Sequence, residues 1–155
     1  MKITNLFTGE KVTCEITKAS RKEILFCREN YSFNWLEELK TYDVFKLTTE
    51  ENPKIIQALF SYSISEDFIW LSKIERANFR SLKVYAAIVE TIVGFTCRKS
   101  FELGFEGYVS FEAKTKLIPY YRTILGAIQL GHSQRMYVST EPAKSLVNLI
   151  YEESS

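Results

Sequence analysis

The sequence has few cysteines and histidines, and each shortage excludes a class of protein. Its three cysteines, Cys14, Cys27 and Cys97, are odd in number and lack the spacing of metal ligands, which argues against a disulfide-stabilised secreted scaffold and against a zinc site. We therefore expect three reduced thiols. The one histidine, His132, lies in a polar stretch, and no serine or cysteine sits in a recognisable nucleophile motif. We expect His132 in a surface loop rather than in a catalytic triad.

An excess of charge of one sign is also absent. Twenty Lys and Arg residues against nineteen Asp and Glu give a net charge of +1, which favours neither nucleic acid nor an anionic membrane as a partner. No stretch approaches the roughly 18 apolar residues of a spanning helix, and residues 1–9 lack the pattern of a signal peptide. We expect a cytoplasmic protein whose partner is a small molecule or a peptide.

Linkers rich in Pro, Gly or Ser are missing too, as are internal repeats. Because 46% of the 155 residues are hydrophobic, the chain can form a core without disulfide or metal support. The prediction is a single domain over residues 1–155, in which residues 1–41 carry the weakest signals. The composition leaves the oligomeric state open, and an oligomer is possible.

Alternating apolar residues predict several strands. Val12, Cys14 and Ile16 alternate with polar residues as in a short strand, whereas apolar residues between 32 and 40 suggest a helix. From Tyr42 onward, the alternation predicts three consecutive antiparallel strands within residues 42–74. Two more strands are predicted, over residues 109–113 and 135–139.

Helical spacing of apolar side chains predicts a long, mostly buried helix from about Val84 to Leu103, with Gly104 as its left-handed cap. A shorter helix near residues 117–125 should be capped by Thr115 and end at Gly126. A final helix should open at residues 140–142. Because a strand directly follows the long helix, the fold class is α/β with a mixed, partly parallel sheet.

This element order resembles that of the GNAT superfamily of acyl-coenzyme A transferases, in which a strand is followed by a short helix ending in a tyrosine and then by a Gly-aromatic pair. The resemblance rests on the stretch Gly-Phe-Glu-Gly-Tyr-Val-Ser-Phe-Glu-Ala-Lys at residues 104–114, on residues 117–121 and on the Leu-Gly-Ala turn at 125–127. Residues 111–118 and 134–137 look more narrowly like a bacterial GNAT-like group. The resemblance implies transfer of an acetyl group from acetyl-coenzyme A to an amine on a small molecule or a peptide.

In that superfamily, the strand before the long helix offers backbone groups to pantetheine, and a loop of pattern Gln/Arg-x-x-Gly-x-Gly/Ala receives the pyrophosphate. The corresponding residues 80–85 keep the basic residue as Arg80 but have Lys83 and Tyr85 in place of the glycines. Lys83 could pair with a phosphate, or Arg80 and Lys83 could be solvated loop charges. The resemblance assigns cofactor contacts to Ile74, Arg76, Arg80, Lys83, Val84, Tyr85 and Lys114, the last standing where many members have an asparagine.

The same resemblance places the general acid at Tyr121, whose phenol would protonate the departing coenzyme A thiolate. Tyr121 could instead complete the apolar stripe of its helix, and Tyr120 is the adjacent alternative. Glu75, at the end of a predicted strand, would deprotonate the amine through water, or it could be a solvated carboxylate. A rival hypothesis is a GNAT-fold binding or regulatory module that has lost the cofactor, because both loop glycines are missing.

Overall fold

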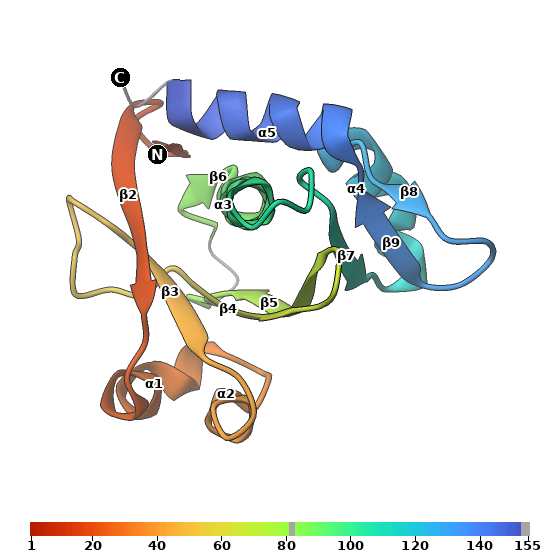
Figure 1. Ribbon diagram of the computed structural model, residues 1–155. Helices are drawn as coiled ribbons and strands as arrows, with labels where there is room; N and C mark the ends of the chain where they lie inside the picture. Colours follow the sequence, from red (N-terminus) through yellow and green to blue (C-terminus); the bar gives the residue numbers. More distant parts are fainter. Residues whose placement is uncertain (81–82, 153–155) are drawn as a thin grey trace. The chain divides into compact units, whose positions relative to one another are not determined.

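The structure is a computed structural model that describes residues 1–80 and 83–152 (Figure 1). It divides into two compact units. The first comprises Met1–Tyr62 and Lys73–Ile88, and the second comprises Ser63–Ser72 and Val89–Ser155. Strands β4 (Ala58–Ile64) and β5 (Ile69–Arg76) each have residues in both units. The expectation of one domain over residues 1–155 stays a prediction.

The first unit contains an antiparallel arrangement of strands. Their order is β6 (Tyr85–Ala86), β1 (Lys2–Asn5), β2 (Lys11–Lys18), β3 (Val44–Thr49) and β4. Leu47 of β3 lies opposite Ile16 on one side and Ala58 on the other, and its side chain is fully buried. The strand predicted around residues 12–16 and the antiparallel pairing of the first two strands predicted within residues 42–74 are therefore confirmed, while β1 was not predicted.

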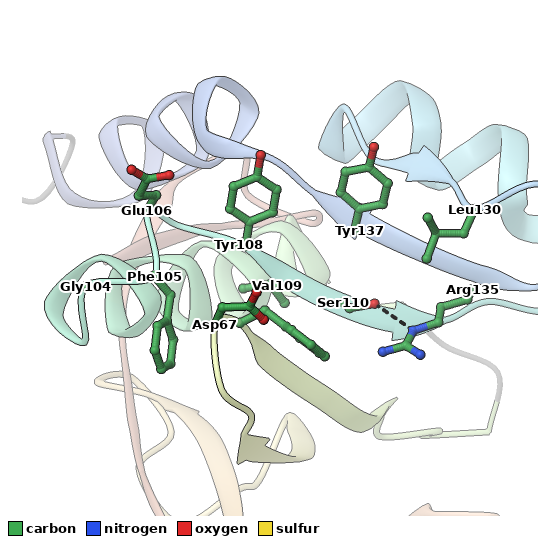
Figure 2. A pocket seen from close by; sticks show the side chains of 11 residues that line it. Asp67, Gly104, Phe105, Glu106, Tyr108, Val109, Ser110, Leu130, Arg135 and Tyr137 are labelled. Atoms are coloured by element: carbon green, nitrogen blue, oxygen red, sulfur yellow. Dashed lines mark hydrogen bonds between the residues drawn. The ribbon is translucent and has the colours of Figure 1, made fainter.

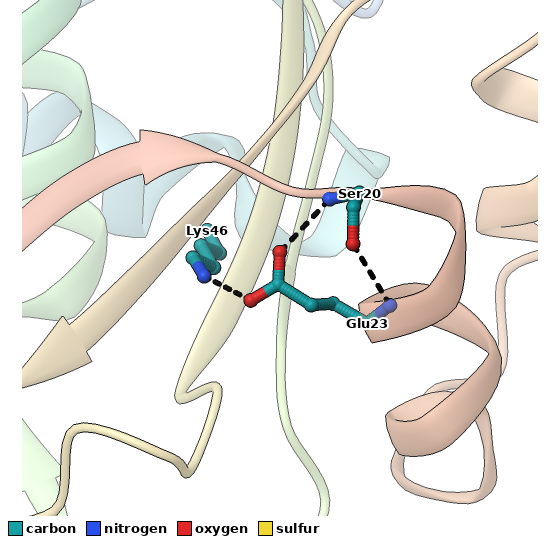
Figure 3. A network of polar contacts seen from close by, with 3 residues as sticks. All are labelled: Ser20, Glu23 and Lys46. Carbon is teal, nitrogen blue, oxygen red and sulfur yellow. Dashed lines mark hydrogen bonds and ion pairs between the residues drawn. The ribbon is translucent and has the colours of Figure 1, made fainter.

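Two short helices follow β2 in the first unit, α1 (Arg21–Cys27) and α2 (Trp35–Glu38). Ser20 and Glu23 form a reciprocal capping box at the start of α1: the Glu23 amide donates to Ser20 Oγ at 3.1 Å and the Ser20 amide donates to Glu23 Oε1 at 2.9 Å. The other carboxylate oxygen of Glu23 accepts a hydrogen bond from Lys46 of β3 (Figure 3). One carboxylate thus starts α1 and ties it to the sheet.

A hydrophobic cluster lies between these helices and the sheet. Its buried members come from α1, α2, β3, β4 and the adjoining segments, and are Ala19, Ile24, Cys27, Trp35, Val44, Ile56 and Leu59. The helix predicted over residues 32–40 corresponds to α2, whereas α1 was not predicted.

The second unit combines parallel and antiparallel pairing. The strand order is β5, β7 (Val109–Glu112), β9 (Arg135–Val138) and β8 (Ile128–Gln129). Ile69 and Trp70 of β5 pair in parallel with Val109 and Ser110, while β9 is antiparallel to β7. The predicted crossover through the long helix and the mixed sheet are confirmed.

Three helices accompany these strands: α3 (Ile88–Glu102), α4 (Ile118–Leu125) and α5 (Thr140–Glu152). Gly94 lets α3 and α5 approach closely, because a Cβ at this position would lie 2.7 Å from the Cδ1 atom of Ile150. Gly104 and Gly126 have the expected positive φ values of 82° and 65° after α3 and α4. In the described residues, no helix is both long enough and apolar enough to span a bilayer.

Two local predictions are wrong. The long helix begins at Ile88 rather than near Val84, because Tyr85 and Ala86 pair with Asn5 and Thr4 of β1 and Ala87 has a φ of 69°. Such a long-range pairing leaves no signal in local spacing. Thr115 begins a 3-10 turn (Thr115–Leu117) and does not cap α4, whose N-cap is Leu117.

Candidate functional site

The predicted site residues divide between the two units. Seven of them fall in the first unit, at the end of β5 and in the segment leading to α3; they are Ile74, Glu75, Arg76, Arg80, Lys83, Val84 and Tyr85. Lys114 and Tyr121 fall in the second unit. Ser81 and Leu82, in the middle of the predicted phosphate loop, lie outside the described residues.

Glu75 accepts four hydrogen bonds from the turn before α2 and from the first residue of that helix. Its Oε2 accepts from the Ser32 amide at 2.8 Å and from the Ser32 hydroxyl at 3.0 Å. Its Oε1 accepts from the Phe33 amide at 3.1 Å and from the indole nitrogen of Trp35 at 2.9 Å. A carboxylate has about four acceptor positions, so these four donors occupy all the acceptor positions of Glu75. Glu75 holds residues 32–35 against the end of β5, and its predicted role as a base stays a prediction.

Arg76, next on β5, is half-buried and incompletely hydrogen-bonded. One terminal nitrogen of its guanidinium donates to the Tyr85 carbonyl at 3.4 Å. Its buried Nε has no partner among the described residues. A buried donor without a partner is costly to the folded state. Ile74, two residues earlier, is also half-buried.

Two exposed basic residues, Arg80 and Lys83, follow β5. Arg80 has a φ of 56°, and both Arg80 and Lys83 are exposed. Arg80 lies at the edge of a pocket of about 640 Å³ that is also lined by Ser32 and Asn78. Within the described part of the chain, neither cation pairs with a carboxylate. Both charges therefore remain free to meet an anion.

Tyr85 does not obstruct the loop, because its ring is turned inward. The ring is buried, and the hydroxyl donates to Glu51. Burial of the phenol, followed by the bond to Glu51, raises the pKa of Tyr85. The side chain that replaces a glycine therefore anchors the short strand β6 in the first unit, and the Val84 carbonyl accepts a bond from the Leu6 amide at 2.8 Å.

The beginning of α3 has features suited to an anion. Ala87 adopts the left-handed conformation one residue before the helix, and the first amides of an α-helix have no intrahelical acceptors. In the first turn, the buried Thr91 hydroxyl has no partner among the described residues. Sequence reasoning missed Ala87 and Thr91, because apolar residues at helical spacing run without interruption from Val84 into the helix.

Tyr121 packs against the sheet from α4. Its ring meets that of Phe111 in β7 edge-on, with centroids 5.4 Å apart, whereas Tyr120 remains 46% exposed. The Tyr121 ring therefore lies against β7, and its predicted role as the general acid stays a prediction. Burial and, to a lesser degree, Tyr120 raise the pKa of Tyr121. Lys114 is exposed, and its carbonyl accepts the Leu117 amide at 2.8 Å.

No protein-family model and no curated protein matches the sequence. Among solved structures, AtaTR bound with AcCoA is 14% identical with a TM-score of 0.58, over 86% of this chain and 97% of that chain. The ribosomal-protein-S18-alanine N-acetyltransferase of Escherichia coli is 12% identical with a TM-score of 0.57, over 81% of this chain and 93% of that one. The chain has the GNAT fold.

A third similar structure, a GNAT-family acetyltransferase from Listeria monocytogenes, has a TM-score of 0.52 at 13% identity and covers 88% of this chain and 97% of its own. The resemblance inferred from residues 104–127 is thus confirmed at the level of fold. In this chain, the β5–α3 segment holds all the predicted cofactor residues except Lys114, and the β7–α4 segment holds Lys114 and Tyr121.

Proposed function

We propose that the chain is an N-acyltransferase that moves an acetyl group from acetyl-coenzyme A to an amine by direct attack. The beginning of α3 carries the proposal: Ala87 has a left-handed conformation one residue before the helix, and the first amides of an α-helix have no intrahelical acceptors. Two proteins with the GNAT fold support it, since AtaTR was crystallised with AcCoA and a Bacillus subtilis acetyltransferase with CoA.

The coenzyme's diphosphate fits the segment that ends at α3. Arg80 keeps the basic residue of the loop pattern, Lys83 and Tyr85 stand in place of its glycines, and Ala87 has a left-handed conformation one residue before α3. Because the Tyr85 ring is buried, its side chain does not compete with a ligand for the exposed side of this segment. Lys83 supplies an exposed positive charge two residues earlier, and amides at a helix N-terminus bind anions.

Tyr121 is proposed as the acid. The amine nitrogen attacks the thioester carbonyl carbon, the carbon–sulfur bond breaks, and the phenol proton goes to the sulfur that leaves. The attacking amine releases one proton, so protons balance when Tyr121 is reprotonated. Since burial raises the pKa of Tyr121, its phenol carries a proton at neutral pH.

Glu75 enters the proposal as the residue that positions residues 32–35 at the end of β5. Glu75 also receives the amine proton through a water molecule in this proposal, and Glu75→Gln separates that role from positioning. The acceptor amine belongs to a small molecule or a peptide. Some structurally similar proteins were solved in complex with an antitoxin or with DNA. Those partners are known for those proteins and are not assigned to this chain.

The test is a transfer assay with isotopically labelled acetyl-coenzyme A and a set of amines that includes free amino acids, polyamines and peptides with a free N-terminus. Mass spectrometry should detect a labelled amide, in amounts that fall sharply in Tyr121→Phe. A protein that binds acetyl-coenzyme A but labels none of these acceptors would contradict catalysis.

The second candidate function is a binding module without catalysis. It is favoured by the replacement of both loop glycines, the first by Lys83 and the second by Tyr85. The two candidates differ in the first step, because an enzyme must bind acetyl-coenzyme A, whereas a module that has lost the cofactor binds none.

A further inference from the structure

A pocket of about 530 Å³ lies in the second unit (Figure 2). It is formed by the turn before β5, the loop between α3 and β7, the first residues of β7 and the β8–β9 hairpin. Tyr121 packs against Phe111, near the other end of β7, and does not line it. This pocket is therefore separate from the proposed acid, and its volume is in the range of small-molecule sites, roughly 300–1,000 Å³.

Arg135 is fixed in this pocket by three contacts. Its Nε donates to the Ser110 hydroxyl at 3.2 Å, and the buried Ser110 hydroxyl donates in turn to the Met136 carbonyl at 2.9 Å. The guanidinium carbon lies 4.9 Å from the centroid of the Trp70 ring and 5.6 Å from that of Phe68. These contacts leave both terminal nitrogens available, and such a guanidinium binds a carboxylate with two parallel hydrogen bonds.

Asp67 brings a negative charge to the same pocket. It lies in the turn closed by the bond from the Ser65 amide to the Phe68 carbonyl, at 2.9 Å. Asp67 and Arg135 form no ion pair within 4.0 Å with each other or with any other residue in the described part of the chain. Two opposite charges thus line one pocket without pairing with each other.

The remaining walls are largely aromatic. The rings of Tyr108 and Tyr137 stack with centroids 6.3 Å apart and stand side by side in Figure 2, and Phe105 adds a third ring. Glu106 is a second acidic residue in the lining. With two carboxylates against one guanidinium, the pocket disfavours a plain anion and suits a ligand that also carries a positive charge.

We propose that this pocket binds a zwitterionic ligand of amino-acid size, with its carboxylate on Arg135 and its ammonium group at Asp67. The aromatic rings would receive an apolar or aromatic side chain. Binding here is independent of acyl transfer, and the pocket would hold its ligand even if the chain had no enzymatic activity.

The two tryptophans of the chain provide an internal control for the test. Trp70 lies beneath Arg135, whereas Trp35 is in the first unit and donates its indole N–H to Glu75. We would titrate ¹⁵N-labelled protein with each of the free L-amino acids up to millimolar concentration. At least one apolar or aromatic amino acid should shift the indole signal of Trp70 and leave that of Trp35 in place.

Blocked ligands and two variants then test the charge pairing. The N-acetyl derivative and the amide of the amino acid that binds should each bind at least about tenfold more weakly. Asp67→Asn and Arg135→Gln should each weaken binding of the amino acid by a similar factor. The control is Lys116→Gln, at an exposed site outside the pocket, and this variant should bind the amino acid with unchanged affinity. The proposal is overturned if no amino acid shifts Trp70, or if either blocked derivative binds as well as the free amino acid.

Discussion

In the proposed reaction, the Tyr121 phenol donates its proton to the sulfur that leaves. Replacing this residue with Phe keeps the ring that packs edge-on against Phe111 and removes only the donor. Turnover should fall about 100-fold or more, whereas the dissociation constant for acetyl-coenzyme A should stay within about twofold. Tyr120→Phe, at the exposed neighbour, should keep full activity. A fully active Tyr121→Phe enzyme would leave Tyr121 as a packing residue only.

Glu75 should matter for stability before it matters for chemistry. A Gln side chain at 75 has an NH₂ group that would face N–H or O–H donors now bound to the carboxylate. We expect Glu75→Gln to lower the free energy of unfolding by about 1–3 kcal/mol, measured by urea denaturation. The matched control is Glu66→Gln, at an exposed turn position, which should leave stability unchanged. A normal stability in Glu75→Gln with lost turnover would instead favour the role of a base.

At the scale of elements, the α1 capping box makes stability depend on pH. The hydrogen bond from Lys46, followed by the backbone bond from Ser20, lowers the pKa of Glu23 in the folded state. A lowered pKa stabilises the fold above the unfolded value of about 4.3, and this contribution is lost as the pH falls through the folded value. Between pH 7 and pH 3, the free energy of unfolding should therefore fall less in Glu23→Gln than in the natural chain. An unchanged pH profile would mean that Glu23 does not tie α1 to β3.

The segment before α3 should determine how tightly acetyl-coenzyme A binds. Lys83→Glu places a negative charge in the proposed phosphate loop, so affinity should fall about tenfold and its dependence on salt should weaken. Lys54→Glu, an exposed lysine in a different loop of the first unit, serves as the control with the same change of charge. If Lys83→Glu and Lys54→Glu bound acetyl-coenzyme A with equal affinity, the phosphates of the coenzyme would not lie next to Lys83.

The elements also show what local patterns could predict. The strands from Tyr42 onward, the left-handed glycines after α3 and α4 and the crossover to β7 follow from spacing and turn chemistry. The start of α3 did not, because β6 forms only by pairing with β1, some 80 residues away in the sequence. The same pairing places Ala87 next to the helix, so this part of the candidate site could not be found from the sequence.

For the whole molecule, the sequence predicted the GNAT fold correctly while leaving the chemistry open. Fold follows from the order of strands and helices, which survives at 12–14% identity to structures with this fold. Chemistry depends on single contacts, such as the four donors on Glu75 or the inward turn of Tyr85. Neither contact has a signal in composition or periodicity, because both involve residues distant in sequence.

The most direct test of acyl-coenzyme A chemistry is a calorimetric titration of the purified protein with acetyl-coenzyme A. We predict saturable binding of one molecule per chain and a rise in melting temperature with ligand concentration. Lys83→Glu should weaken this binding, and Tyr121→Phe should leave it intact. An absence of both heat and thermal stabilisation at millimolar acetyl-coenzyme A would contradict the proposed function and favour a binding module with the GNAT fold.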